Sequence, residues 1–281
     1  MSAVVREREF PFTRNDFDFL RRLANEHTGI VVGDDKFDMF YSRLARRVRA
    51  LRLRDFASYC DYLRKGEDEA ELIELVNAIT TNLTAFFREN HHFDYLRDAA
   101  IPERMVANRG ERRLDIWSAG CSTGEEPYSL GITIGEMGGR LRGWQVNIRA
   151  TDIDSNVLAT ASRGVYRRDR VEGLGPARLR RWFLKGKGRQ EGMVRVKPEL
   201  RERIEFGLLN LMGEWRQEPQ DIIFCRNVII YFDKESKKRL VERFAEVVKP
   251  GGYLFIGHSE SLFQVTDRFE LIGKTIYRRV G

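Results

Sequence analysis

Residues 114–130 read Leu-Asp-Ile-Trp-Ser-Ala-Gly-Cys-Ser-Thr-Gly-Glu-Glu-Pro-Tyr-Ser-Leu, a segment that combines the patterns of a strand, a glycine turn and a helix. The apolar run at 114–117 is typical of a buried strand. Gly120 and Gly124 have no Cβ, so the turn between them can adopt unusual backbone angles and approach a ligand closely. Pro127 fixes φ near the start of a helix. The stretch therefore predicts a ligand site on a strand–turn–helix unit.

The turn itself indicates which ligand is bound. It is a G-x-x-x-G turn and lacks the G-x-G-x-x-G pattern of dinucleotide enzymes. Glu125 and Glu126 at the helix start would repel a phosphate, and they favour a ligand with cationic or hydroxyl groups. S-adenosylmethionine (SAM) carries a sulfonium, an ammonium and a ribose. The alternative is an ordinary turn whose acidic residues only complement the helix dipole.

The composition excludes several classes of protein. With 281 residues, 42% of them apolar and 32% charged, the chain is long enough for one large α/β domain and a smaller one. It has no apolar signal core and no apolar run near the roughly 18 residues of a membrane span, so a cytoplasmic protein that is not membrane-inserted is expected. Three cysteines without a C-x-x-C pair and four scattered histidines indicate no metal site. The net charge of +7 suits an acidic partner of any kind.

Residues 1–80 are predicted to form a small all-helical domain, because apolar residues recur at three- and four-residue spacing and no strand pattern appears. The expected helices cover residues 12–24, 36–52, 55–65 and 70–80.

The second of these helices is rich in arginine. Arg43, Arg46, Arg47 and Arg54 share one arc, and six arginines stand between Met39 and Arg54 without one acidic residue. Like charges at i, i+3 and i+4 repel by a few tenths of a kcal/mol per pair. The arc is therefore either a solvated face or a docking surface for an acidic partner.

Two polar segments flank the glycine turn in the chain. Asn82 or Thr84 can cap a helix expected to run to about residue 108. The second strand, predicted at 146–151, ends in Asp152 and Asp154, where Rossmann-like folds bind ribose hydroxyls. Alternatively, one of these two carboxylates caps the helix at 155–162.

The remainder of the chain predicts a mostly parallel, Rossmann-like sheet. Residues 163 to about 203 interrupt the alternation of strands and helices, and a small β-rich insertion is expected at about 183–203. Strands are predicted near 204–207, 221–225 and 253–257, a helix at 234–248, and a closing hairpin around residues 273 and 274. The expected sheet is parallel with one antiparallel edge strand.

Three motifs, NLTAFFR at 82–88, STGEEPYS at 122–129 and CRNVIIYFD at 225–233, resemble the CheR-type chemotaxis receptor methyltransferases. The similarity runs from about Phe12 to the C-terminus. The resemblance implies a class I SAM-dependent methyltransferase fold for residues 81–281 and a receptor-docking role for residues 1–80. It also implies transfer of a methyl group to glutamate side chains on the cytoplasmic helices of chemoreceptors, with S-adenosylhomocysteine (SAH) as product and a monomeric enzyme.

The resemblance also assigns site residues. Arg88 and Tyr231 match positions near the methyl group. The positions that match cofactor contacts are Asn82, Thr84, Arg88, Glu125, Asp152, Asn210, Leu211, Arg226 and Asn227. In the family, an insertion like the one expected here can bind a peptide at the receptor C-terminus, for which Lys185, Lys187 and Arg195 are candidates.

The chemistry agrees with a carboxylate acceptor, which is already ionised at neutral pH and needs no general base. Two other classes of protein are alternatives. A nucleic-acid methyltransferase would suit the positive charge, but the Asn/Asp-Pro-Pro-aromatic turn of base-amine methylases is missing, because Cys225-Arg226-Asn227 stands in its place. A non-catalytic SAM-binding adaptor is disfavoured by the presence of Arg88 and Tyr231.

Overall fold

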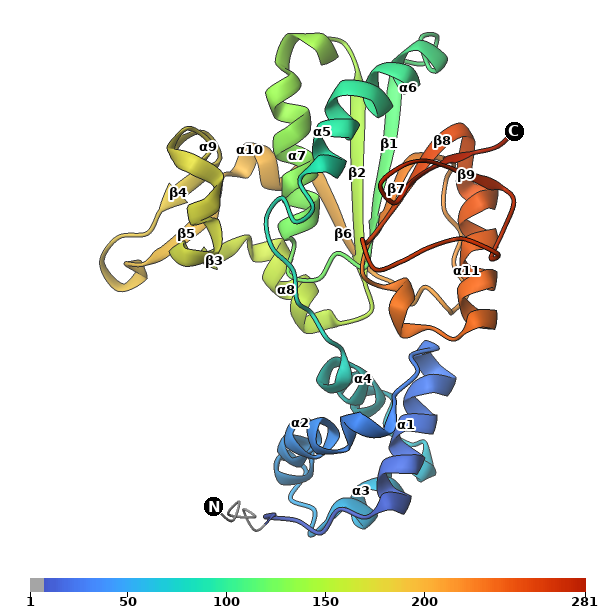
Figure 1. The fold of residues 1–281 in the computed structure, drawn as a ribbon. Helices are drawn as coiled ribbons and strands as arrows, with labels where there is room; N and C mark the ends of the chain where they lie inside the picture. Colours follow the sequence, from blue (N-terminus) through green and yellow to red (C-terminus); the bar gives the residue numbers. More distant parts are fainter. Residues whose placement is uncertain (1–7) are drawn as a thin grey trace, which may run out of the picture. The chain divides into compact units, whose positions relative to one another are not determined.

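The computed structural model of the protein describes residues 8–281 and divides into two compact units, with the boundary between Thr81 and Asn82. The first unit is all helical, as predicted (Figure 1). Local sequence explains its helix ends. Thr13 and Asp16 form a capping box before the first helix, Gly29 ends it with a φ of 73°, and Asp55 and Asp68 cap the third and fourth. The elements are α1 (Arg14–Thr28), η1 (Asp34–Lys36), α2 (Phe37–Ala50), α3 (Phe56–Lys65) and α4 (Glu69–Ile79).

The second unit contains a seven-stranded sheet in the order β6-β2-β1-β7-β8-β10-β9. The first five strands in this order are mutually parallel, and β10 is antiparallel to both of its neighbours. The antiparallel strand is thus second from the edge, which corrects the expectation of an antiparallel edge strand. The strands are β1 (Arg113–Ala119), β2 (Gln145–Asp152), β6 (Ile204–Leu208), β7 (Gln220–Cys225), β8 (Val248–Ile256), β9 (Phe269–Gly273) and β10 (Ile276–Arg279).

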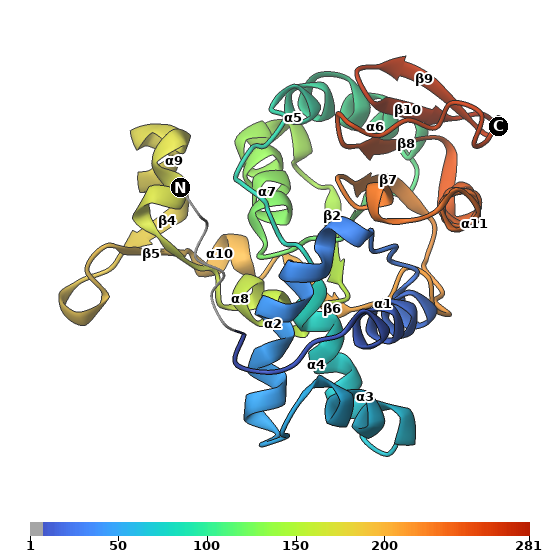
Figure 2. The same ribbon diagram turned by 60° about the horizontal axis from the view of Figure 1, so that its bottom comes forward.

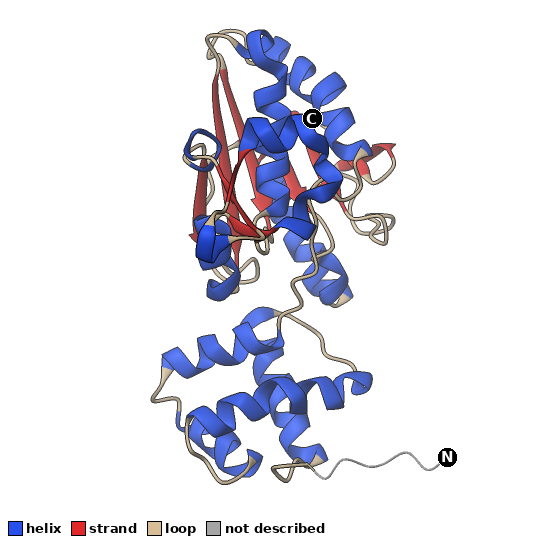
Figure 3. Cartoon of the chain, turned by 90° about the vertical axis from the view of Figure 1, so that its left-hand side faces the viewer, coloured by secondary structure: helices blue, strands red, loops and turns tan. Residues whose placement is uncertain are grey.

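Helices cover both faces of this sheet (Figure 3). Along β1 the side chains alternate, so that Leu114 and Ile116 enter one apolar core and Trp117 and Ala119 enter the other. The helices just before and after β1 in the chain pack into the first core, and the last helix packs into the second. The helical elements of this unit outside the insertion are α5 (His91–Tyr95), η2 (Leu96–Ala100), α6 (Ile101–Ala107), α7 (Glu125–Met137), η3 (Gly138–Leu141), α8 (Ser155–Arg163), η6 (Ile229–Tyr231) and α11 (Lys234–Val247).

Two elements that contain prolines differ from the expectation. The helix expected up to residue 108 contains the π-helical turn η2, which ends two residues before Pro102; this proline lacks an N–H and clashes with the preceding turn. Pro250 lies inside β8, which begins at Val248, five residues before the strand expected at 253–257, and the pairing register with β7 shifts in this part of the strand.

The insertion is larger than the expected range of about 183–203. Its three-stranded antiparallel sheet has the order β3-β5-β4, and β3 lies at Val165–Arg167. The sheet stands apart from the seven-stranded sheet in both ribbon views (Figures 1 and 2). Its other elements are η4 (Arg168–Leu174), α9 (Gly175–Trp182), β4 (Phe183–Lys185), η5 (Gly188–Gln190), β5 (Met193–Val196) and α10 (Pro198–Arg201). No helix within residues 8–281 is long and apolar enough to cross a membrane.

Candidate functional site

The order of the parallel strands determines where a ligand can bind. The chain passes from β1 to β2 and β6 in one direction and then from β7 to β8 in the other, so the direction reverses between β1 and β7. Ligands of open α/β sheets bind beyond the carboxyl ends of the strands at this point. The motif residues after β1, β2 and β7 all lie at this edge.

The turn after β1 requires left-handed backbone at three positions. Gly120 and Gly124 have φ of 85° and 98°, and Ser122 has φ of 50°. A Cβ at Gly120 would lie 2.4 Å from a methyl group of Val228, so a larger residue there would displace the loop after β7. The turn is braced by Asp152, whose Oδ2 accepts the Ser122 N–H at 2.7 Å.

The structure assigns the capping role, which the sequence left open between Asp152 and Asp154, to Asp154. Asp154 caps α8, accepting the N–H groups of Asn156 and Val157 at 2.9 and 3.3 Å. Asp152 instead supports the glycine turn, and burial raises the pKa of its carboxyl group. Asp154 also accepts a bond of 2.8 Å from the Asn82 side chain, which ties the 82–88 segment to the tip of β2.

The two acidic residues at the start of α7 have different partners. Glu126 accepts from Ser118 at 2.7 Å and from Arg226 Nη1 at 3.1 Å, and burial raises the pKa of its carboxyl group. Glu125 is 1% exposed and accepts from Thr123 and Arg170. Both carboxylates therefore accept hydrogen bonds from protein donors, in addition to complementing the helix dipole.

Arg170 was not predicted as a site residue. Besides Glu125 it holds the main-chain oxygen of Thr84 at 2.7 Å, so it links the 82–88 segment to α7. No motif indicated this residue, since it lies 45 residues beyond Glu125 in an arginine-rich insertion.

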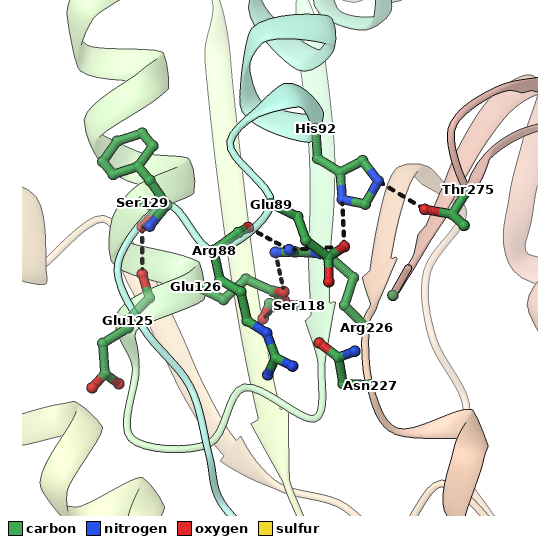
Figure 4. A network of polar contacts seen from close by, with 12 residues as sticks. Arg88, Glu89, His92, Ser118, Glu125, Glu126, Ser129, Arg226, Asn227 and Thr275 are labelled. Carbon is green, nitrogen blue, oxygen red and sulfur yellow. Dashed lines mark hydrogen bonds and ion pairs between the residues drawn. The ribbon is translucent and has the colours of Figure 1, made fainter. Parts of the chain in front are cut away.

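A buried charge cluster surrounds Arg226, which is 7% exposed (Figure 4). Its Nη1 contacts Glu126, and its Nη2 donates to the main-chain oxygen of Arg88 and lies 3.3 Å from Glu89 Oε2. These protein groups take up both terminal nitrogens of the guanidinium, whereas its buried Nε has no hydrogen-bond partner within the described residues. Within residues 8–281, Arg88 itself makes one side-chain hydrogen bond, from Nη1 to Leu83 O at 2.9 Å, and no ion pair.

Glu89 and His92 complete the cluster. Glu89 Oε1 lies 2.8 Å from His258 Nδ1, and these partners together with Arg226 lower the pKa of Glu89 to about 2, against the opposing effect of burial. His92 is fully buried, and desolvation, with the nearby Arg226 charge, lowers its pKa to about 4. At neutral pH the cluster therefore contains an ionised Glu89 and a neutral His92.

The loop after β7 is held by Glu260, another residue that the sequence did not indicate. Its Oε2 accepts the N–H of Asn227 at 2.9 Å, and its Oε1 accepts that of Ile230 at 3.1 Å. Asn227 has φ of 59°, an unusual value for a residue with a side chain. Tyr231 follows in η6 and is half-buried, and its hydroxyl has no hydrogen-bond partner within the described part of the chain.

The remaining predicted cofactor residues lie after β6 and in the 82–88 segment. Asn210 accepts the Met212 N–H at 2.9 Å and so shapes the loop. The side chain of Leu211 is 7% exposed and belongs to the core around Trp117. Thr84 contributes the carbonyl oxygen held by Arg170.

Two arginines of the predicted arc, Arg43 and Arg47, have partners within their own unit, an arrangement that neither a solvated face nor a docking surface implied. Arg43 donates to the carbonyl oxygens of Ile79 and Thr80 at the end of α4, at 2.9 and 2.6 Å. Arg47 pairs with the buried Glu71 at 2.5 Å. Arg46 is exposed without a partner within residues 8–281. Arg54 does not share the helical arc, because α2 ends at Ala50; it lies in the turn before α3, exposed beside Asp55 at 3.2 Å.

The positive charge of the protein is concentrated in the insertion. Residues 163–203 contain 14 lysines and arginines against five acidic residues, whereas residues 1–81 contain 14 against 15. Lys185, Lys187 and Arg195 are exposed, and none of them forms an ion pair within the described residues. Arg195 lies on the central strand opposite Leu184, which is 48% exposed.

The edge fits SAM as a ligand. Asp152 and Glu125 provide carboxylate oxygens suited to hydroxyl or cationic groups and unsuited to phosphate, and the glycine turn permits close approach. Within residues 8–281, no group of three or more histidine, cysteine or acidic residues is arranged to bind a metal ion.

Comparison with known proteins agrees with this geometry. Residues 15–80 match the family model of the CheR methyltransferase all-alpha domain, and residues 82–278 match the CheR methyltransferase SAM-binding domain. A chemotaxis protein methyltransferase of Salmonella typhimurium is 45% identical, covering 91% of this chain and 87% of the relative. Chemotaxis protein methyltransferase 2 of Pseudomonas aeruginosa is 45% identical, covering 98% and 97%. Among solved structures, the N-methyltransferase NodS of Bradyrhizobium japonicum with bound SAH has a TM-score of 0.37 at 12% identity, covering 66% of this chain and 87% of that one. The chain therefore belongs to the CheR family of SAM-dependent chemotaxis protein methyltransferases.

Proposed function

We propose that the protein methylates glutamate side chains on the cytoplasmic helices of chemoreceptors, in the cytoplasm, giving glutamate methyl esters and SAH. One observation carries the proposal. The guanidinium of Arg88 retains unused donors at the carboxyl edge of the sheet, while Arg170 and Arg226 are each paired with a glutamate. In Figure 4 the side chains of Arg88 and Asn227 extend to the same side of the buried network. A free guanidinium suits a carboxylate acceptor.

Bound SAM supplies an electrophilic methyl group on its sulfonium. We assign its ribose and amino acid portions to Asp152, Glu125, Asn82 and the loops that contain Asn210 and Asn227. The carboxylate acceptor is ionised at neutral pH, so the protein has no proton to remove before transfer. Its task is to align the acceptor and exclude water, effects worth up to about 7–11 kcal/mol together.

Arg88 and Tyr231 are assigned to the acceptor. Arg88 orients the carboxylate through its planar donors, which a lysine would not reproduce. Tyr231, the last residue of η6, donates from its hydroxyl group, which has no partner within the described residues. Because Arg226 bonds the main-chain oxygen of Arg88, the segments that contain the two residues are joined.

The test uses SAM with a tritiated methyl group and a receptor cytoplasmic fragment. Labelled receptor that releases volatile methanol in mild alkali identifies a methyl ester, whereas methylated amines keep the label. The proposal requires alkali-labile incorporation that disappears when the acceptor glutamates of the receptor are changed to alanine. Label that resists alkali, or that enters nucleic acid in place of receptor, would reject it.

The units outside the catalytic edge are proposed to recruit the receptor. The exposed Arg46 and Arg54 of the helical unit are assigned to acidic receptor helices. Lys185, Lys187 and Arg195 are assigned to a receptor C-terminal peptide. The concentration of positive charge in the insertion supports the second assignment, since an extended peptide can pair with the edge of β3 or β4 and place its carboxylate near these cations.

A further inference from the structure

We infer that Glu89 is a positioning residue for the methyl-transfer step, acting through Arg226 and the main chain of Arg88. It is not among the residues assigned to cofactor or acceptor above. Its side chain is 10% exposed and contacts groups from two other segments of the edge. Oε1 lies 2.8 Å from His258 Nδ1, and Oε2 lies 3.3 Å from Arg226 Nη2.

These contacts join three loops that are far apart in the sequence. Glu89 belongs to the segment before α5, Arg226 follows β7, and His258 follows β8. One carboxylate therefore connects the loop that contains Arg88 with the loop that leads to Tyr231. A second contact joins the same two loops, because Nη2 of Arg226 also donates to the Arg88 carbonyl oxygen.

The backbone around Arg88 shows why such a restraint is needed. Phe87 and Glu89 both have left-handed backbone, with φ of 52° and 56°. A non-glycine residue in this region costs on the order of 1–3 kcal/mol and persists only where its surroundings hold it. Ser129 Oγ holds the N–H of Phe87 at 2.9 Å, and the carboxylate contacts hold Glu89. Arg88 therefore stands between two strained residues, each fixed by its own contacts.

Charge determines which substitution is informative. Arg226 lies between the carboxylates of Glu89 and Glu126, and the pKa of Glu89 is lowered to about 2, so Glu89 is an anion throughout the working range. Glu89→Gln keeps the shape but removes the charge that attracts Arg226. Glu89→Asp keeps the charge on a shorter side chain. The order of activity is expected to be wild type, Glu89→Asp, Glu89→Gln.

The experiment measures total methyl incorporation into receptor at saturating SAM, with SAH binding by calorimetry on the same preparations. We expect Glu89→Gln to lower kcat at least tenfold, while the KM for receptor and the Kd for SAH change less than threefold. Glu89→Asp should recover part of kcat. Glu111→Gln, an exposed change of the same kind in the same unit, is the matched control and should leave all three values unchanged.

A double-mutant cycle with Arg226→Lys separates positioning from general destabilisation. If Glu89 acts through Arg226, the second substitution should add less than threefold to the loss of kcat in Glu89→Gln. Multiplicative losses, a kcat within twofold of wild type, or a loss confined to KM would each overturn the inference. If Glu89→Gln does not fold, the inference rests on Glu89→Asp and its cycle with Arg226→Lys. The inference builds on the proposed function, but total incorporation tests Glu89 whatever the acceptor, whereas alkali lability tests the glutamate assignment.

Discussion

Glu260 Oε2 accepts the main-chain N–H of Asn227 at 2.9 Å, so a buried carboxylate holds a left-handed residue at the centre of the candidate site. The same oxygen accepts the Gly257 N–H at 2.5 Å, and Oε1 accepts that of Ile230. The carboxylate thus replaces the main-chain partners that an irregular loop lacks. The loop after β7 is therefore shaped by a residue 33 positions further along the chain.

We expect Glu260→Ala and Glu260→Gln both to destabilise the protein, by about 1–3 kcal/mol for the lost acceptors. The glutamine variant is informative because its NH2 group would face N–H donors that need an oxygen. Urea unfolding measures the effect, and Glu270→Gln on the exposed side of β9 is the control. An unfolding free energy equal to that of wild type in both variants would show that the loop does not depend on Glu260.

Arg88→Ala and Tyr231→Phe should lower methyl transfer far more than cofactor affinity. A donor directed at the reacting group is typically worth about 10²–10³ in kcat, so we expect a decrease of about 10²-fold for Arg88→Ala and a smaller one for Tyr231→Phe. Arg88→Lys keeps the charge without the planar donors and serves as the matched variant. Calorimetry with SAH and turnover with receptor should be measured on the same preparations. Unchanged turnover in both variants would remove the two residues from the mechanism.

Arg46 and Arg47 are adjacent but should respond differently to charge reversal. Arg46 is exposed, so Arg46→Glu is expected to raise the KM for receptor and leave kcat nearly unchanged. Arg47 pairs with Glu71, which is 2% exposed, so Arg47→Glu should destabilise the helical unit by about 3 kcal/mol or more. Receptor titration and thermal unfolding distinguish the two effects. Equal KM values for Arg46→Glu and wild type would argue against docking through this arc.

Acid should weaken the fold in two steps. The pKa of buried His92 is lowered to about 4 from 6.5, so the stability that its neutral form provides is complete above pH 6.5 and is lost as the pH falls toward 4. The pKa of Glu89 is lowered to about 2 from 4.5, so its contribution is complete above pH 4.5 and is lost toward pH 2. Unfolding free energy should therefore fall first between pH 6.5 and 4.

His92→Gln cannot acquire the buried charge, so it should flatten the first step without changing the second. His91→Gln is the control, because His91 is adjacent but exposed. Urea unfolding at several pH values measures both. A His92→Gln profile as steep as that of wild type between pH 6.5 and 4 would assign the acid sensitivity to other groups.

The sequence predicted the parts of the structure that depend on near neighbours. The helix expected at 55–65 is found at Phe56–Lys65 after its cap Asp55, and the 114–130 stretch forms the expected strand, turn and helix. The helix expected at 12–24 instead runs to Thr28, where Gly29 ends it. The motifs placed Asp152 and Arg226 at the correct edge of the sheet. Their roles were less predictable, because the partners of Arg226 lie 100 and 138 positions away in the chain.

The errors have the same origin. Six arginines without an acidic residue among them appeared unpaired, but Glu71 and the end of α4 reach Arg47 and Arg43 from 24 to 37 positions away. The first strand of the insertion was missed because Val165–Arg167 has only three residues, too few to show an alternating pattern. Glu89 and Glu260 carry no sequence signal, since only the fold brings their carboxylates to the loops that they hold.

The last prediction concerns the insertion. We expect a receptor C-terminal peptide to bind there through electrostatic attraction as well as through main-chain pairing with a strand. Arg195 lies on β5 between Val165 and Leu184, so a peptide on this side of the small sheet would meet a cation and apolar side chains together. Arg195→Glu should weaken peptide binding at least tenfold and leave methylation of a tail-less receptor unchanged.

Arg180→Glu makes the same charge change on α9, where the side chain is also exposed, and it controls for the overall charge of the insertion. Titration of receptor tail peptides by calorimetry decides among the outcomes. Equal weakening in both variants would mean that long-range attraction, which salt should screen, explains the binding without a specific site at Arg195. Binding indifferent to Arg195 would place the peptide elsewhere, and the lack of saturable binding to any receptor tail would reject the tether.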